Sequence, residues 1–217
     1  MRIAIIPARG GSKGIKNKNL VEFRGKPLIS WVLDTALKSE LFDKVIVSTD
    51  SNNIASYVKK NFLEVLVIKR PQEIATDTSV SEDAVYHVVE NIEKLFSCIV
   101  DQVLFIQATS PFTTINDLER LVDKLNNNDS VAFYTEDYGY HFEIDDMYSP
   151  RLPRQTREPK KKEAGNAWAF NAQKFKVCKS RLFGKIGLVK ISNLRAFEID
   201  EYIDLKVGEI MGTVIDK

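Results

Sequence analysis

Short apolar runs alternate with helix-patterned segments over the first 134 residues of the chain. Five runs rich in Val and Ile are typical of buried strands: 2–8, 44–48, 64–68, 102–107 and 130–134. Between them, four segments carry apolar residues at helical spacing: 27–39, 52–60, 79–95 and 114–125. Strands that alternate with helices form βαβ units. The pattern therefore predicts an α/β fold with a Rossmann-like, mostly parallel sheet flanked by helices.

After residue 134 the regular alternation of strands and helices ends. Residues 166–171, 187–191 and 195–199 are predicted as further strands, and 204–211 as a C-terminal helix. Residues 138–162 have no clear period and are rich in Tyr, Pro and charge, so we interpret them as an insertion in the main sheet. This stretch could equally be a solvated basic loop. Six cations lie within its last twelve residues: Arg151, Arg154, Arg157, Lys160, Lys161 and Lys162.

The first predicted strand leads directly into a loop rich in glycine and cations. The loop contains Gly10, Gly11 and Gly14 together with Arg9, Lys13, Lys16 and Lys18. Glycine lets the backbone approach a ligand with its N–H groups turned inward, and clustered cations attract an anion. Open α/β sheets bind ligands at the carboxyl ends of their strands. We therefore interpret the loop as a triphosphate-binding site.

Three known glycine motifs can be compared with this loop. The chain lacks G-x-x-x-x-G-K-[ST], and the glycine spacing does not fit G-x-G-x-x-G. Residues 10–14 do match G-x-S-x-G, the nucleophile elbow of hydrolases. A serine hydrolase built on Ser12 would also need an acid and a histidine, and the histidines of the chain are His87 and His141. That class remains a remote alternative.

Length, composition and charge limit the class of protein to which the chain can belong. The length of 217 residues, 44% of them apolar, suits a single domain with a substantial core. Cys98 and Cys178 form no C-x-x-C pair, which fits a reducing cytoplasm. The apolar N-terminal run stops at Pro7, so we expect neither a signal peptide nor a membrane span. The net charge of +1 does not favour nucleic-acid binding.

Several motifs together resemble the acylneuraminate cytidylyltransferase family. Residues 7–14, Pro-Ala-Arg-Gly-Gly-Ser-Lys-Gly, followed by Lys18-Asn19, resemble its CTP-binding motif. Five further matches follow in family order: Val47-Ser-Thr-Asp50, Arg70-Pro-x-x-x-Ala-x-Asp77, Gln107-Ala-Thr-Ser-Pro111, Arg154-Gln155 and Glu198-Ile-Asp200. The resemblance spans nearly the whole chain, and it implies a single nucleotidyltransferase domain over residues 1–217.

The resemblance also implies a reaction and a site. CMP would pass from CTP to the anomeric hydroxyl of a sialic-acid-like keto sugar acid, with release of pyrophosphate. Arg9, Lys13 and Lys18 would hold phosphate oxygens beside the loop residues Gly10, Gly11 and Ser12. Asn19, Arg70 and Ser81 would recognise cytosine, and Gln107 would contact the acceptor sugar.

The same resemblance implies Mg²⁺ as the cofactor. Its ligands would be Asp200 and Glu198, placed on one face of the strand predicted at 195–199. Mg²⁺ prefers oxygen ligands and usually keeps several waters. The family generally has Asp at both positions, so a ligand role for Glu198 is less firmly implied than one for Asp200.

The resemblance implies that the insertion, taken as residues 136–164, forms a dimerisation element that reaches the partner subunit's sugar site. We therefore expect a homodimer, with Arg154 as the cation that binds the sugar carboxylate through its planar fork. Residues 166–170, Asn-Ala-Trp-Ala-Phe, depart from the family's Asn-Gly-Ala-Ile-Tyr, which we expect to affect the choice of sugar.

Two questions stay open at this point. The acceptor could be N-acetylneuraminic acid, its deaminated analogue, a legionaminic or pseudaminic acid, or an eight-carbon ulosonic acid. A non-catalytic nucleotide-binding module would keep the loop, although it would have no need of Asp200.

Overall fold

The computed structural model describes residues 1–12, 14–141, 148 and 150–215. Its main sheet has the strands β1 (Arg2–Pro7), β4 (Lys44–Thr49), β5 (Val65–Lys69), β6 (Gln102–Ile106), β7 (Ser130–Asp137), β8 (Lys160–Asn171) and β9 (Ile186–Lys190). A two-stranded ribbon consists of β2 (Glu22–Phe23) and β3 (Lys26–Pro27). The described α-helices are α1 (Leu28–Lys38), α2 (Asn52–Asn61), α3 (Ser81–Phe96), α4 (Ile115–Leu125), α6 (Ala172–Cys178) and α7 (Tyr202–Ile215).

The seven-stranded sheet has the order β5-β4-β1-β6-β8-β7-β9. Parallel pairs join β1 to β4 and β6, β4 to β5, and β7 to β9, whereas β8 runs antiparallel to both of its neighbours. The predicted mostly parallel α/β sheet is confirmed. Because β1, β4, β5 and β6 share one direction, the loops that follow them meet at one edge of the sheet.

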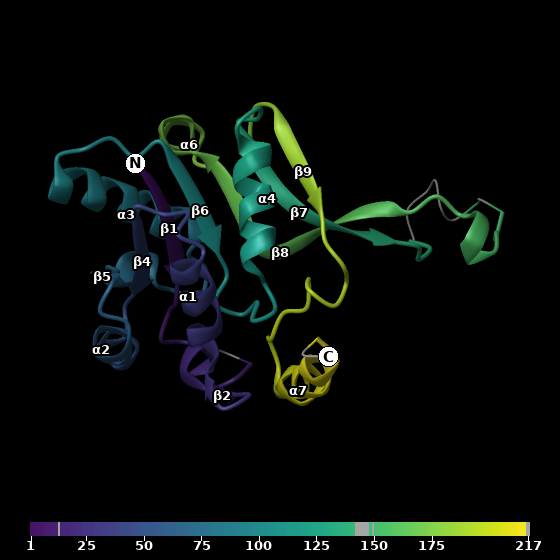
Figure 1. Ribbon diagram of the computed structural model, residues 1–217, viewed down its shortest axis with the longest axis horizontal. Coiled ribbons are helices and arrows are strands. Elements are labelled where there is room, and N and C mark those ends of the chain that lie inside the picture. The colour runs from purple at the N-terminus through teal and green to yellow at the C-terminus, as the bar shows by residue number, and fades with distance from the viewer. Residues whose placement is uncertain (13, 142–147, 149, 216–217) are drawn as a thin grey trace.

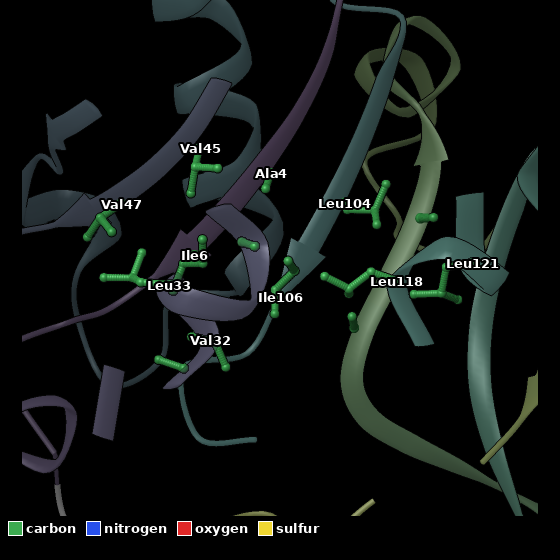
Figure 2. Packing of buried hydrophobic residues seen from close by; sticks show 14 of the residues in the cluster. Ala4, Ile6, Val32, Leu33, Val45, Val47, Leu104, Ile106, Leu118 and Leu121 are labelled. Atoms are coloured by element: carbon green, nitrogen blue, oxygen red, sulfur yellow. The ribbon is translucent and has the colours of Figure 1, made fainter. Parts of the chain in front are cut away.

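Helices cover both faces of the sheet. Helices α1, α2 and α4 pack on one face, with Leu33, Val58 and Leu118 in a single buried cluster. Figure 2 shows side chains of α1 and α4 lying against those of β1, β4 and β6. Helices α3 and α6 pack on the other face. Truncating a fully buried leucine such as Leu33 to alanine is expected to cost about 2–5 kcal/mol of stability.

Side-chain hydrogen bonds cap the N-termini of α2 and α4. The Ser51 side chain accepts a hydrogen bond from the Ile54 amide at the start of α2. At the start of α4, Thr114 and Asp117 form a reciprocal capping box. Such caps satisfy backbone N–H groups that have no partner within the helix, and they place both helix starts at the carboxyl edge of the sheet.

The predicted insertion corresponds to an arm on the sheet. Strands β7 and β8 continue beyond a register shift after Ala132 as an antiparallel ribbon that extends away from the body of the molecule (Figure 1). A 3-10 helix, Arg154–Thr156, lies on this arm. The predicted range 136–164 thus overlaps the ends of both strands, and residues 142–147 and 149 lie outside the described residues.

The strand predicted at 195–199 is wrong. Residues 192–200 form turns and irregular backbone between β9 and α7, although the Ile199 amide donates to the Thr109 carbonyl at 2.9 Å. The apolar residues that suggested a strand pack elsewhere: Ile199 is fully buried and Phe197 partly buried in a small cluster beneath α7. Their alternation therefore reflects packing under a helix rather than membership of the sheet.

Candidate active site

The glycine-rich loop begins where β1 ends and is fastened to the end of β4. The Ala8 amide donates to the Ser48 carbonyl at 2.9 Å, and the Gly10 amide donates to Asp50 Oδ1 at 2.8 Å. A Cβ on Gly10 would lie 2.9 Å from the Ser51 Cβ, so a larger residue would push the loop away from β4. Asp50, to which sequence reasoning gave no role, therefore anchors this loop.

The cations of the loop are turned toward acidic partners. Arg9 Nη1 donates to Asp77 Oδ1 at 2.8 Å and to the Thr76 carbonyl at 3.2 Å. Lys18 Nζ donates to Asp200 Oδ1 at 2.7 Å. Lys13, the third cation assigned to phosphate, lies outside the described residues. Each described pair is partly exposed to solvent, so the two ion pairs add little to stability and can be exchanged for other anions.

Two polar side chains are buried beside the loop. Asn19 is 6% exposed and donates from Nδ2 to the Arg9 carbonyl at 3.0 Å. Arg70 is also 6% exposed and donates from Nε to Ser48 Oγ at 3.1 Å and from Nη2 to the Ser48 carbonyl at 2.8 Å. Burial lowers the pKa of Arg70, and the negative charge of Asp50 opposes that effect. Burying a cation costs free energy, so Arg70 contributes less to stability than its hydrogen bonds alone suggest.

A cavity of about 400 Å³ brings the predicted residues together. Segments far apart in the sequence contribute to its wall, among them the loop, the end of β5, the start of α3, the end of β6 and the segment before α7. The lining residues are Pro7, Arg9, Ser12, Gly14, Lys18, Asn19, Arg70, Ser81, Gln107, Ala108, Thr109, Asp200 and Glu201. Of the predicted site residues, Gly10 and Gly11 lie in the same loop without lining the cavity.

Asp200 reaches the cavity in a way that the sequence did not predict. It follows irregular backbone rather than the end of a strand, and the main chain at Gly14 packs against it so closely that a Cβ there would lie 2.3 Å from the Asp200 carbonyl oxygen. The Asp200 amide donates to Asp204 Oδ2 at 2.9 Å. The start of α7 therefore holds this carboxylate against the loop.

Glu198 lies apart from the 400 Å³ cavity. It lines a neighbouring cavity of about 460 Å³ at the base of the arm, between the Asn193–Glu198 segment and β8. Glu198 Oε1 is buried and has no hydrogen-bond partner in the described part of the chain. Burial raises the pKa of Glu198, and the nearby negative charge of Asp200 raises it further. The two carboxylates thus interact electrostatically although they line different cavities.

Asn166 connects the acidic segment to the sheet. Its Nδ2 donates to Thr113 Oγ1 at 3.1 Å and to the Arg195 carbonyl at 2.7 Å, and its own carbonyl accepts from the Gln107 amide at 2.9 Å. Asn166 is 1% exposed. A buried Asn within an apolar run was the one available sequence signal for this structural role.

Two other expectations about the site can be compared with the structure. Arg154 lies on the arm, with its Cζ 5.1 Å from the centre of the Tyr138 ring, and it does not line the 400 Å³ cavity. Trp168 and Phe170 are buried in the core beneath α3 and line neither cavity. The expected effect of these residues on the choice of sugar stays a prediction, and for Trp168 and Phe170 it would act through packing of the core.

The hydrolase alternative gains no support from the geometry. Ser12 lines the cavity, but His87 lies in α3 and His141 on the arm, and neither belongs to the cavity wall. A nucleophilic serine needs a base within hydrogen-bonding reach. The arrangement instead offers cations, hydrogen-bond donors and a carboxylate around a space large enough for a nucleotide.

Comparison with known proteins agrees with this arrangement. The sequence profile of the family described as "Cytidylyltransferase" matches residues 3–173. The chain belongs to the cytidylyltransferase family. The resemblance inferred from the motifs is confirmed at this level, and the match ends before Asp200 and α7.

Two relatives within the cytidylyltransferases show which activities occur among them. The chain is 41% identical over 138 residues to the N-acylneuraminate cytidylyltransferase of Escherichia coli O18:K1:H7, covering 61% of this chain and 31% of that protein. It is 34% identical over 132 residues to the pseudaminic acid cytidylyltransferase of Campylobacter jejuni, covering 61% of this chain and 56% of that protein. The match thus spans less than two thirds of either relative.

A solved structure extends the fold likeness over the full length. CMP:2-keto-3-deoxy-manno-octonic acid synthetase, determined as a complex with CTP, superposes with a TM-score of 0.69 over 99% of this chain and 98% of that chain. The two sequences are 14% identical, so the likeness concerns the fold. Among the described residues, no helix is long and apolar enough to cross a bilayer.

Proposed function

We propose that this protein transfers CMP from CTP to the anomeric hydroxyl of a sialic-acid-like keto sugar acid and releases pyrophosphate. The observation that carries the proposal is that the side chains assigned to phosphate and to the base, namely Arg9, Lys18, Asn19, Arg70 and Ser81, all line one 400 Å³ cavity. Related acceptors are a pseudaminic, legionaminic or eight-carbon ulosonic acid. The names of the two relatives support the reaction and differ in the sugar.

Arg9 and Lys18 would place positive charge beside the phosphate oxygens, on which negative charge develops during the reaction. In nucleotidyl transfer the protein mainly positions the reactants and stabilises negative charge on phosphate oxygens. Arg9 and Lys18 both line the cavity and would exchange their acidic partners for the triphosphate. A unit charge pair 4 Å apart is worth about 4 kcal/mol at an effective dielectric of 20. Contacts that tighten as charge builds up on the leaving group would therefore lower the barrier.

The buried polar side chains suit cytosine. The Asn19 amide donates to the loop backbone, so its carbonyl oxygen can accept from the exocyclic amine of the base. Arg70 carries five donor hydrogens and shares its described bonds with Ser48 alone, which leaves donors for the base carbonyl. Ser81 adds a hydroxyl from the start of α3. A site that hydrogen-bonds specific edges rejects bases that leave its own groups unpaired.

We further propose that Mg²⁺ assists the reaction, held by Asp200 and by Glu198. The unpartnered Glu198 oxygen, its raised pKa and the adjacent Asp200 charge fit a cation between them. No group of three or more Asp, Glu, His or Cys side chains suited to a metal occurs among the described residues, so phosphate oxygens and water would complete the shell. When bound, the ion would neutralise charge on the leaving pyrophosphate.

We also propose a homodimer in which the arm reaches the partner subunit. The arm extends away from the body of the molecule (Figure 1), and Arg154 does not line the 400 Å³ cavity. Cations are concentrated on it, including Arg151, Arg157 and Lys161. A guanidinium delivered from the arm of a second copy would bind the sugar carboxylate with two parallel hydrogen bonds.

Pyrophosphate release tests the proposal. CTP, UTP, ATP and GTP are each offered with Mg²⁺ and a panel of nine- and eight-carbon keto sugar acids. Release with CTP and one acid is the expected result. If no acid supports release but CTP still raises the melting temperature, the protein is a binding module. Absence of both release and protection would refute the nucleotide site itself.

A further inference from the structure

Arg181 forms a two-point ion pair with the helix that carries Ser81. It lies in the loop after α6, beyond the residues that the family profile matches. Its Nε donates to Glu82 Oε1 at 2.6 Å and its Nη2 donates to Glu82 Oε2 at 3.0 Å. Glu82 lies in the first turn of α3, directly after Ser81, which lines the nucleotide cavity.

The guanidinium also lies over two aromatic rings of the sheet. Arg181 Cζ is 4.4 Å from the centre of the Trp168 ring and 5.1 Å from that of Phe105. These rings are stacked, with centres 5.1 Å apart, and Trp168 Nε1 donates to Glu163 Oε1 at 2.6 Å. A guanidinium over aromatic faces gains cation–π attraction and loses freedom of movement. Trp168, which departs from the family pattern, therefore forms part of the aromatic surface on which the Arg181 guanidinium packs.

The loop that carries Arg181 is itself bound to the sheet. Ser130 Oγ donates to the Phe183 carbonyl at 2.8 Å and accepts from the Phe183 amide at 2.9 Å. Asp129 Oδ2 accepts from the Lys185 amide at 2.7 Å. Arg181 thus contacts residues of β6 and β8 on one side and the first turn of α3 on the other.

The N-cap position of α3 has no side-chain cap. Val80, the N-cap residue, makes no side-chain capping bond and is 56% exposed. The first four amides of a helix have no i−4 partner within the helix, so contacts of the first-turn side chains matter more where a side-chain cap is absent. Burial alone would raise the pKa of Glu82, but its hydrogen bonds and charge interaction with Arg181 lower the pKa below its ordinary value. The Arg181–Glu82 ion pair therefore stabilises the first turn of α3.

We propose that Arg181 is a positioning residue for the nucleotide site, because it fixes the first turn of α3 and so holds Ser81 against the base. This inference rests on the proposed CTP site. Loss of the contact leaves the cavity's charges in place but lets Ser81 move with a frayed helix start. The effect belongs to CTP binding rather than to the chemical step.

The chain offers a matched control in Lys176. This residue of α6 donates to Glu93 Oε2 at 2.7 Å and lies 3.0 Å from Glu90 Oε1. It thus joins α6 to the same helix α3, but near the C-terminal end of α3 and away from Ser81. Lys176→Ala removes an ion pair of the same kind without touching the helix start.

The experiment compares Arg181→Ala, Arg181→Lys and Lys176→Ala with the wild type. We expect Arg181→Ala to raise the Kd and KM for CTP about tenfold, equivalent to about 1.4 kcal/mol, with kcat changed less than about twofold. Arg181→Lys keeps the positive charge but cannot form the two-point bond to Glu82, so its Kd for CTP should lie between those of the wild type and Arg181→Ala. Amide hydrogen exchange should accelerate at Val85 and Tyr86 in Arg181→Ala, and at neither in Lys176→Ala.

Distinct outcomes overturn the inference and the proposed function. If the wild type binds CTP and Arg181→Ala binds it equally well, or if Lys176→Ala weakens CTP binding as much, Arg181 has no positioning role. Unchanged exchange at Val85 and Tyr86 would refute it as well. A wild type that fails to bind CTP would instead refute the proposed function, while the exchange data still decide whether Arg181 holds the helix.

Discussion

Replacing Arg70 by methionine should separate nucleotide recognition from stability. The side chain is buried, its pKa is lowered by burial, and its described hydrogen bonds go to Ser48. Methionine fills much of the same volume without the charge. The Ser48 carbonyl keeps its bond from the Ala8 amide at 2.9 Å, so the substitution leaves only the Ser48 hydroxyl without a described partner.

The substitution should change the stability of the protein much less than its binding of CTP. One unpartnered buried group costs about 1–3 kcal/mol, and release of a desolvated cation offsets part of it. We expect a net change within about 1 kcal/mol, which corresponds to about 2–4 °C in melting temperature for a chain of this size. A hydrogen bond from a charged group to the base is worth about 1.5–3 kcal/mol. Its loss should raise the KM for CTP by about 10- to 150-fold.

The assay is kcat/KM for CTP and UTP in parallel, together with the melting temperature. Arg70→Met should weaken binding of CTP and UTP alike, because cytosine and uracil both carry the carbonyl oxygen that Arg70 would contact. Lys18→Met should also weaken both nucleotides, and it should weaken competition by inorganic triphosphate, whose binding Arg70→Met should leave unchanged. Lys69→Met, which removes the neighbouring exposed cation of β5, controls for the change in net charge. If Arg70→Met leaves the CTP KM within about twofold of the wild type, the assignment of Arg70 to the base is wrong.

Three further changes test other parts of the site. Asp200→Asn should reduce turnover by at least about a hundredfold at saturating CTP while the melting temperature is unchanged or raised, and full Mg²⁺-dependent turnover would argue against the metal assignment. Arg154→Ala should raise the KM for the sugar acid far more than that for CTP, whereas equal increases would indicate a structural or dimerisation role. Glu82 has a lowered pKa in the folded protein, so its contribution to stability is present above its ordinary value of 4.5 and is lost as the pH falls through the folded value. Glu82→Gln should therefore be less stable than wild type at pH 7 and approach it in acid; a constant difference in urea titrations across that range would contradict the pairing with Arg181.

The central strands were predictable because both of their faces are buried. A strand such as Lys44–Thr49 has no polar face, so its apolar run stands out and its bounds differ from the predicted 44–48 by one residue. Strand β8 was predicted only from residue 166 onward. Its first part, from Lys160, is held by backbone pairing with β7 and has exposed side chains, so it carries no apolar signal.

The candidate site was predictable to the extent that its residues follow strands. Gln107 and Arg70 come directly after buried runs, and parallel strands bring such positions to one edge. The sequence could not show that Glu198 would turn toward a second cavity, because its direction depends on irregular backbone packed under α7. Nor could it show the Arg181–Glu82 pair, whose members are 99 positions apart along the chain.

Asn166 has a consequence for the protein's behaviour on heating. Among the described residues, segment 193–200 is joined to the rest of the fold by side-chain bonds of Asn166, Arg195 and Asp200 and by one backbone bond, from Ile199 to Thr109. Segments held by few backbone bonds open locally at free energies well below that of global unfolding. Warming should therefore release the segment that carries both carboxylates while the strands stay paired. Inactivation would precede melting and would reverse on cooling, since the segment can reattach to a sheet that never came apart.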